Sequence, residues 1–382
     1  MSREKNKRIV SIYQKFFKIG LPIARVLLGS VFIFSGFVKS IDPLGSTYKI
    51  QDYLRAFGSP FDSLVGLAFA AAVLLSTLEL VIGLSLLFNT HTKKASFLAL
   101  GFMLVMTPLT LYIALTNPVS DCGCFGDALV ISNWATFYKN IAFSALAITL
   151  LVFRKRLKPI ISIYRQSLAV AIFFGMGIVI SIYSYRHLPF IDFLPYKIGV
   201  NIPASMVIPE NAISNEYTTT FIYAKNGVQK EFTLDNYPKG DPSWVFVDQK
   251  SILVKKGYEP PIHDFSILNS QMEDITEDVL YNDKNSYLLT MYDINKTSIE
   301  GAKHAEKMYH QALNSGASFY ALTASIDTDI QAFVKKTGVT FPFYKTDPTA
   351  LKTIIRANPG LILLKKGTIL GKWNWRDFPI EE

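Results

Sequence analysis

Long uncharged runs alternate with short charged loops through the first half of the chain. A helix needs about 20 apolar residues to cross roughly 30 Å of hydrocarbon. Four runs reach that length, and a fifth of about 18 residues only just does. They are residues 19–38, 64–88, 95–115, 134–153 and 168–185. The pattern predicts five membrane-spanning helices, the first a retained signal-anchor, because no small-residue cleavage motif follows the basic start.

Positive charge gathers in alternate loops of this half. The basic segments are "SREKNKR" before the first run, "NTHTKK" after the second and "RKRLKPIISIYR" after the fourth. Cytoplasmic loops carry the excess of Lys and Arg. This bias predicts a multi-pass protein of the bacterial inner membrane, with a cytoplasmic N-terminus and a periplasmic C-terminal half. If the weak fifth run does not cross, the C-terminal half is cytoplasmic instead.

The second half has the shorter periodicities of a soluble protein. Two alternating stretches around "KNG" in "TTTFIYAKNGVQKEFTL" predict a β-hairpin within a β-rich connector, residues 189–260. Apolar strands and amphipathic helices then alternate over 261–382, which predicts parallel βαβ units with a terminal antiparallel hairpin. The expected architecture is a four-helix membrane domain over 1–160, a fifth helix within 161–188, the connector and a soluble α/β domain.

Composition supports this division of the chain. Half of the residues are hydrophobic and 18% are charged, against about 25% charged in soluble domains. Residues 1–188 have a net charge of +12, whereas residues 189–382 have a net charge of −3. The basic residues therefore belong mainly to membrane loops. The soluble half lacks the excess of positive charge that a nucleic-acid binder needs.

The loop between the first two runs, residues 39–62, also has a helical pattern. Its apolar and aromatic residues recur at helical spacing, and Gly58 is a natural stop. These residues are Tyr48, Ile50, Tyr53, Leu54 and Phe57. The spacing predicts a short amphipathic helix lying on the outer membrane surface.

Two charged residues fall inside the predicted spans. Arg25 lies in the first run and Glu79 lies in the second. The depth of each residue is counted from the cytoplasmic end of its run. We expect them at similar depth and paired, because an isolated charge in a membrane is costly. Such a pair could serve a proton or substrate pathway, or it could only fix the packing of two helices.

The chain has only two cysteines, Cys122 and Cys124, in the loop "DCGCFGD". The predicted topology places them on the oxidising side of the membrane, where disulfides persist. Lys39 and Lys139 are expected at the same level, and a nearby ammonium lowers the pKa of a thiol. Alternatively, Lys139 only extends its ammonium toward the lipid headgroups.

Four roles for the cysteine pair can be compared. A zinc site needs four ligands, and the histidines are scattered along the chain, so no metal is expected. A crosslink between residues two apart stabilises little and is strained. A redox dithiol could pass electrons between a partner's thiols and a lipid-soluble carrier. The fourth role is a pair packed at a turn with no exchange partner.

The membrane half resembles a known family. "ARVLLGSVFIFSGFVKSIDP" and the "DCGCFGD" loop ahead of the fourth run resemble DoxX-like proteins of the MauE (methylamine utilisation) type, over about residues 20–155. The resemblance implies a four-helix bundle related to vitamin K epoxide reductase and to quinone-linked disulfide-forming proteins. It also implies that Cys122 and Cys124 are a redox pair, with a quinone as cofactor and a periplasmic or membrane protein as partner. Those quinone-linked enzymes use two cysteine pairs, whereas this chain has one.

The soluble half resembles the thioredoxin fold of TlpA-type proteins. The segments "GYEPPIHDFSIL" and "ANPGLILLKKGTIL" carry the resemblance, which spans about residues 261–377. It implies that Pro359 is the cis-proline before the third core strand. The family's dithiol would follow "SYLLTMYD", where this chain has "INKTS". The resemblance therefore implies a degenerate thioredoxin-like domain that docks partners without exchanging disulfides.

Two functions remain open on these grounds. The first is a thiol–disulfide redox protein that acts on or matures a periplasmic partner. The second is a non-enzymatic envelope assembly or binding protein, in which the cysteines only shape a loop. A transporter is a third class, but five spans without an inverted repeat disfavour it.

Overall fold

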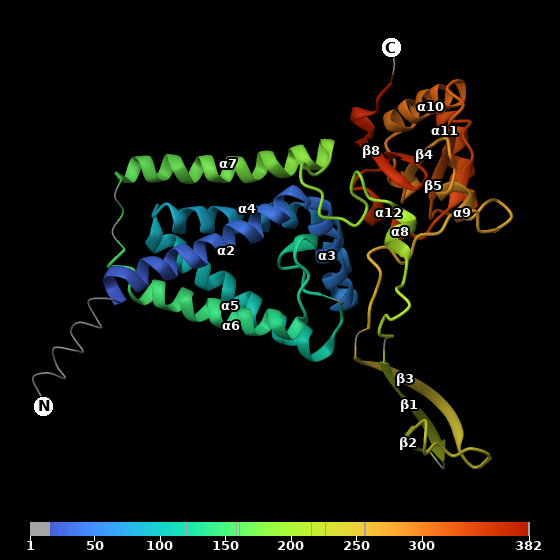
Figure 1. Ribbon diagram of the computed structural model, residues 1–382. Helices are drawn as coiled ribbons and strands as arrows, with labels where there is room; N and C mark the ends of the chain where they lie inside the picture. The colour runs from blue at the N-terminus through green and yellow to red at the C-terminus, as the bar shows by residue number, and fades with distance from the viewer. Residues whose placement is uncertain are drawn as a thin grey trace, which may run out of the picture.

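Five long helices form the first half of the computed structural model (Figure 1). The structure describes residues 16–119, 121–157, 159, 161–214, 216–225, 227–255 and 257–380, so the basic segment at residues 2–8 lies outside it. The five helical segments that are long and apolar enough to cross a membrane are Phe17–Ile41, Ser59–Leu87, Thr92–Thr116, Asn133–Val152 and Ile163–His187. They confirm the multi-pass membrane half that the five apolar runs predicted.

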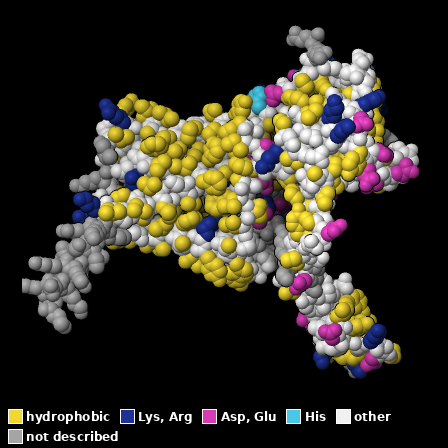
Figure 2. Space-filling view, viewed as in Figure 1, with side chains coloured by type: hydrophobic (Ala, Val, Ile, Leu, Met, Phe, Trp, Pro, Cys, Tyr) yellow, Lys and Arg dark blue, Asp and Glu magenta, His cyan; other side chains and the backbone are white. Residues whose placement is uncertain are grey.

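The helices of this bundle begin and end close to the predicted runs. A π turn, η1 (Phe16–Gly20), leads into α2 (Leu21–Ile41), and a 3-10 segment, η2 (Ser59–Leu67), leads into α4 (Ala68–Leu87). The others are α5 (Thr92–Thr116), α6 (Asn133–Val152) and α7 (Ile163–His187). Figure 2 shows hydrophobic side chains covering the lateral surface of the bundle, as lipid contact requires.

Helices α2 and α4 pack closely because glycines line their contact. A Cβ added to Gly36 would lie 2.5 Å from the backbone nitrogen of Leu80, and one added to Gly83 would lie 2.5 Å from that of Ile33. Small residues allow two membrane helices to approach in this way. Helix α7 packs against the same pair from outside (Figure 1).

One end of the bundle is covered by helix α3 (Pro43–Ala56) and by the cysteine loop with its short 3-10 turn η3 (Gly126–Ala128). Asp42 caps α3 by accepting a 2.8 Å hydrogen bond from the backbone nitrogen of Gly45. The predicted amphipathic helix is confirmed, and it stops just before Gly58, which has a φ of 94°.

After the bundle, helix α8 (Ile202–Met206) precedes a small antiparallel sheet that stands apart in Figure 1. Its strand order is β2-β1-β3, formed by β1 (Glu216–Lys225), β2 (Val228–Thr233) and β3 (Val245–Lys255). Lys225 pairs with Val228, so the predicted hairpin is confirmed, although Asn226 in its turn lies outside the described residues.

The last part of the chain is a five-stranded sheet of order β6-β5-β4-β7-β8. Its strands are β4 (Asn285–Met291), β5 (Ser318–Thr323), β6 (Phe343–Lys345), β7 (Gly360–Lys365) and β8 (Thr368–Asn374). Strands β4, β5 and β6 are parallel, whereas β7 and β8 run antiparallel to their neighbours. This is the predicted mixed sheet with a terminal hairpin.

Helices cover both faces of that sheet. They are α9 (Thr276–Leu280), α10 (Ile299–Asn314), α11 (Asp327–Thr337) and α12 (Pro348–Ile354), with short 3-10 turns η4 (Ile294–Lys296) and η5 (Trp375–Asp377). Consecutive residues of β4, Leu288 and Leu289, face opposite sides of the sheet and belong to the two separate cores. The peptide bond before Pro359 is cis, as predicted, and β7 follows it directly. The domain has the thioredoxin-like architecture that the sequence predicted.

Candidate functional site

Cys122 and Cys124 lie in the loop between α5 and α6, and their sulfurs are 3.0 Å apart as free thiols. Gly123 between them has a φ of 64°, a conformation that favours glycine. Its backbone nitrogen donates a 2.8 Å hydrogen bond to Oδ1 of Asp121. The positive φ therefore turns the chain so that both side chains reach the same point.

Two helices hold this loop through its backbone. The hydroxyl of Tyr53, from α3, donates to the carbonyl oxygen of Cys122 at 2.5 Å. Ser35 Oγ, from α2, lies 2.7 Å from the carbonyl oxygen of Cys124. Lys49 of α3 forms a 2.6 Å ion pair with Asp121. Each cysteine is thus positioned by a different helix.

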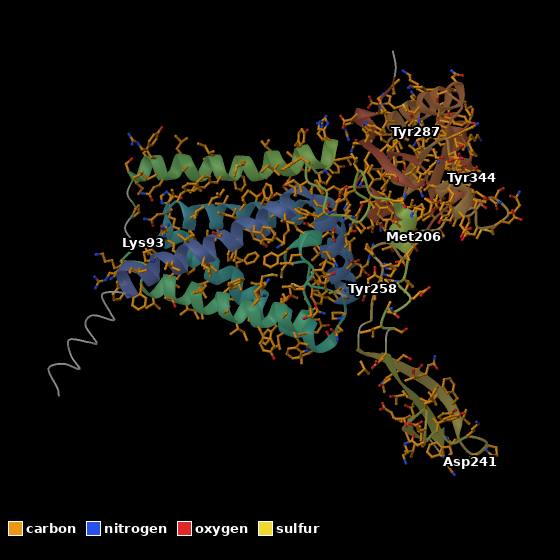
Figure 3. The ribbon with its side chains drawn as sticks, viewed as in Figure 1. Lys93, Met206, Asp241, Tyr258, Tyr287 and Tyr344 are labelled. Atoms are coloured by element: carbon orange, nitrogen blue, oxygen red, sulfur yellow. The ribbon has the colours of Figure 1, made fainter. Side chains whose placement is uncertain are left out.

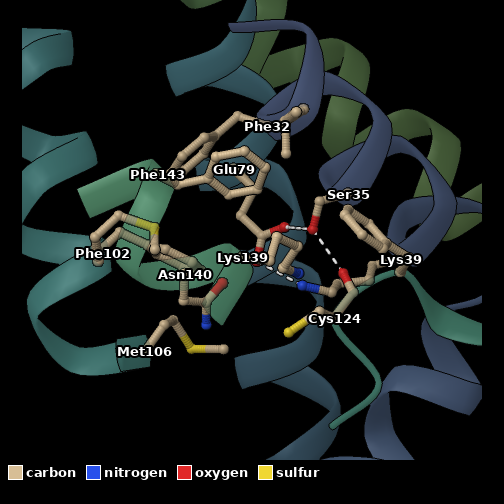
Figure 4. Close-up of a pocket in the computed structure, with 13 residues that line it drawn as sticks. Phe32, Ser35, Lys39, Glu79, Phe102, Met106, Cys124, Lys139, Asn140 and Phe143 are labelled. Atoms are coloured by element: carbon tan, nitrogen blue, oxygen red, sulfur yellow. Dashed lines mark hydrogen bonds and ion pairs between the residues drawn. The ribbon is translucent and has the colours of Figure 1, made fainter. Parts of the chain in front are cut away.

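A buried ion pair lies beside Cys124 (Figure 4). Lys39 Nζ, at the end of α2, is 2.7 Å from Oε1 of Glu79, and Ser35 Oγ is 2.5 Å from Oε2 of the same carboxylate. The Glu79 side chain is 3% exposed. Ser35 therefore connects the carboxylate of Glu79 to the backbone of the cysteine loop.

The predicted pair between Arg25 and Glu79 is wrong. Arg25 instead donates to the backbone carbonyls of Leu86 and Leu87, the latter at 3.0 Å. These carbonyls lie seven to eight residues along α4 from Glu79, about 11 Å at 1.5 Å per residue. Glu79 is closer to the opposite end of α2, and Lys39 occupies its carboxylate.

Lys139 of α6 also lies near Cys124. Its ammonium sits over the ring of Phe125, 4.1 Å from the centroid, and it lines the same pocket as Cys124 and Lys39. The fold thus brings both predicted lysines to Cys124 (Figure 4). Both lysines were expected at the level of the cysteine pair, and both line the pocket that Cys124 lines.

The two thiols have pKa values that move in opposite directions. The hydrogen bond between the sulfurs, together with burial, raises the pKa of Cys122. The same hydrogen bond lowers the pKa of Cys124, and the charges of Lys139 and Lys39 add to this effect against the cost of burial. These shifts favour the thiolate at Cys124, with Cys122 as its hydrogen-bond donor.

An apolar cavity of about 300 Å³ opens beside the sulfurs. Both cysteines line it, with Tyr53 of α3 and with apolar side chains of α4 and α5. These apolar residues are Ala72, Leu75, Phe102, Val105, Met106 and Leu109. The cavity lies between the cysteine loop and helices α3, α4 and α5, so a lipophilic molecule bound in it would contact the cysteines.

Several residues of the site carry no recognisable pattern in the sequence. Ser35 and Tyr53 lie in helices whose spacing predicts packing alone. Arg356 of the soluble domain forms ion pairs with Asp42 and Asp127 at 2.9 and 2.8 Å, although 314 residues separate it from Asp42. Only the docking of the two halves could have identified this contact.

Comparison with known proteins gave two family matches. Residues 17–153 match the family described as methylamine utilisation protein MauE, and residues 217–256 match a domain of unknown function (DUF8463). The MauE match contains the cysteine loop and four of the five long helices, and it agrees with the MauE-type resemblance that the sequence predicted for this region. No curated protein matches the chain.

Among solved structures, the chain is similar to one titled "Solution structure of a putative protein disulfide isomerase from Bacteroides thetaiotaomicron". The two chains are 18% identical, with a TM-score of 0.25. The alignment covers 31% of this chain and 77% of that chain.

Proposed function

We propose that this membrane protein is a thiol–disulfide redox protein whose reactive groups are Cys122 and Cys124. The observation that carries the proposal is the pair itself, with sulfurs 3.0 Å apart. One of them, Cys124, lies near two lysines, Lys39 and Lys139, whose charges favour its thiolate. A thiolate is the nucleophile in disulfide exchange, and a dithiol at this spacing can close to a disulfide.

The proposed reaction is oxidation of a dithiol on an extracytoplasmic protein partner. A partner thiolate attacks the Cys122–Cys124 disulfide, forms a mixed disulfide and releases one cysteine as a thiolate. The second partner thiolate then attacks the mixed disulfide and displaces the other cysteine, the one bonded to the partner, which leaves a partner disulfide and the reduced pair. The pair closes again as two electrons and two protons pass to a lipid-soluble quinone, the oxidant class that we assign to the apolar cavity.

The side of the membrane belongs to the same proposal. The charge bias of the loops places the cysteine loop and the soluble domain in the periplasm. Arg356 joins the soluble domain to Asp127 of the cysteine loop, so both lie on one side. That contact supports five crossings, because an even number would leave the soluble domain on the cytoplasmic side with the N-terminus, across the membrane from the cysteine loop.

The proposal is tested by trapping free thiols in native membranes under three conditions: untreated, mildly reduced and reoxidised with a quinone analogue. We expect the mild reductant to reduce the Cys122–Cys124 disulfide to two free thiols. We expect the quinone analogue to oxidise these thiols to the disulfide again. The Cys122→Ser, Cys124→Ser double variant is the control for labelling elsewhere. A pair that stays reduced, or stays oxidised under mild reductant, would contradict the proposal.

A second candidate function is a binding protein of the cell envelope. It is favoured by the η4 turn (Ile294–Lys296), which follows β4 where a thioredoxin-like dithiol would stand and which contains no cysteine. Here the soluble domain docks a partner and the thiols are dispensable. Stable co-purification of a partner with the double cysteine variant, at wild-type yield, would favour this function over redox exchange.

A further inference from the structure

Arg356 follows α12 and reaches from the soluble domain into the membrane domain. Its side chain is 8% exposed. Nε donates to both carboxylate oxygens of Asp42, at 3.1 and 2.9 Å, and Nη2 donates to Oδ2 of Asp127 at 2.8 Å. Nη1 donates to the backbone carbonyl of Lys352 at 2.5 Å. One buried guanidinium thus joins three separate segments, and we call this set of contacts the Arg356 clamp.

Both carboxylates of the clamp belong to elements that position the thiols. Asp127 lies three residues after Cys124 in the same loop. Asp42 caps α3, the helix whose Tyr53 holds the carbonyl of Cys122. Breaking a buried ion pair by removing one partner is costly, because the other charge remains desolvated. The clamp therefore favours a single position of the cysteine loop.

The clamped loop presents different groups to two adjoining cavities. Both cysteines line the apolar cavity, and Cys122 is only 6% exposed. The second cavity, of about 270 Å³, shares Gly123 with the first but is lined by Gly126, Lys352 and Arg356 in place of the cysteines. A thiol that approached through this second cavity would meet glycine backbone and the soluble domain before either sulfur.

We propose that the Arg356 clamp holds the cysteine loop closed, with its sulfurs turned to the apolar cavity. Release of Asp127 from Arg356 then exposes the sulfurs to thiols in water. In this arrangement the soluble domain regulates access to the pair, and Arg356 is a positioning residue. The inference rests on the proposed function, because it concerns when the same two thiols meet a protein partner.

The test measures access to the thiols rather than turnover. The full-length protein in right-side-out membrane vesicles is reduced and then labelled with a membrane-impermeant maleimide. Loss of a buried charge partner costs several kcal/mol, so we expect labelling at least about 10-fold faster in Arg356→Gln. We expect a smaller acceleration in Asp127→Asn, which keeps the Asp42 contact. The maleimide rate does not require the pair to cycle, so the test can fail independently of the redox proposal.

A matched control is available at the same domain junction. His187 of α7 contacts Asp377 of the soluble domain, 2.9 Å from Nδ1 to Oδ1, without touching the cysteine loop. His187→Gln should keep the wild-type labelling rate. Equal acceleration in His187→Gln would overturn the proposal, because general loosening of the domain would explain it. A wild-type labelling rate in Asp127→Asn would also overturn the proposal. If Arg356→Gln does not fold, the labelling rate of Asp127→Asn decides the test.

Discussion

Cys122 and Cys124 differ in their surroundings although they are two residues apart. Cys122 is buried and its sulfur lies 3.0 Å from the other sulfur, whereas Cys124 lies beside Lys39 and Lys139. Burial and the hydrogen bond raise the pKa of Cys122, and the same bond with the two ammonium groups lowers the pKa of Cys124. These shifts favour the thiolate at Cys124 rather than at Cys122.

A hydrogen bond donated by Cys122 to Cys124 predicts how the alkylation of Cys124 depends on pH. A thiol with a lowered pKa stays ionised to lower pH, so alkylation of Cys124 should persist below the usual thiol midpoint of about 8.5. Cys122→Ser retains a donor, whereas Cys122→Ala removes one. Hydrogen bonds to charged groups contribute about 1.5–3 kcal/mol, so the midpoint should be roughly one to two pH units higher in Cys122→Ala than in Cys122→Ser.

The measurement is the rate of iodoacetamide alkylation of Cys124 between pH 5 and 10, at constant ionic strength. Mass spectrometry of the alkylated peptide identifies the modified residue. Equal midpoints in the two variants would show that the charges of Lys39 and Lys139, rather than Cys122, set the protonation state of Cys124.

At the scale of elements, the contact between α2 and α4 positions the charged part of the site. Lys39 and Glu79 meet because the two helices approach closely along Gly29, Gly36 and Gly83. The backbone atoms of α4 lie within 3.0 Å of a Cβ built at Gly36, and backbone cannot rotate away as a flexible side chain would. The glycines are therefore a structural requirement of the site.

Gly36→Ala should destabilise the membrane domain. Overpacking a close contact costs about 1–3 kcal/mol, so the thermal midpoint in detergent should fall by several degrees. Gly175→Ala in α7 is the matched control, because nothing lies within 4 Å of a Cβ at that position. It should leave the midpoint unchanged or raise it slightly, since alanine favours a helix. Equal midpoints for both variants would contradict the role of the contact.

At the scale of the whole molecule, the soluble domain is fastened to the cysteine-loop end of the bundle. The Arg356 clamp, the His187–Asp377 contact and the 2.6 Å pair between Lys372 and Asp192 all lie at this junction. Lys93 marks the opposite end of the bundle, and Asp241 marks the outer part of the three-stranded sheet (Figure 3). The two ends of the molecule are therefore expected to face opposite sides of the membrane.

Single cysteines introduced into the Cys122→Ser, Cys124→Ser background test this topology. Lys239 is exposed near Asp241, and Lys93 is exposed at the start of α5. In right-side-out vesicles, an impermeant maleimide should label Lys239→Cys directly and Lys93→Cys only after permeabilisation. Labelling of both variants in intact vesicles, or the reverse order, would contradict the five-span topology.

Features that depend on neighbouring residues were predictable from the sequence. The five apolar helices, the amphipathic α3, the hairpin of β1 and β2 and the mixed five-stranded sheet each follow from local periodicity. The positive φ that Gly123 permits also belongs to this local level. Pro359 was predicted to be cis through a resemblance rather than through periodicity, and the structure agrees.

Contacts between distant segments needed the fold. Counting residues from the helix ends paired Arg25 with Glu79 incorrectly, because the relative depth of two membrane helices is set by their packing along the glycine contact. The sequence by itself determined that two cysteines stand in a glycine-containing loop between apolar helices. Only the tertiary structure decided which lysine pairs with Glu79, which sulfur is favoured as the thiolate, and that Arg356 contacts the cysteine loop. Each of these depends on distances between side chains that are far apart in the chain, and burial determines how strongly such charges interact.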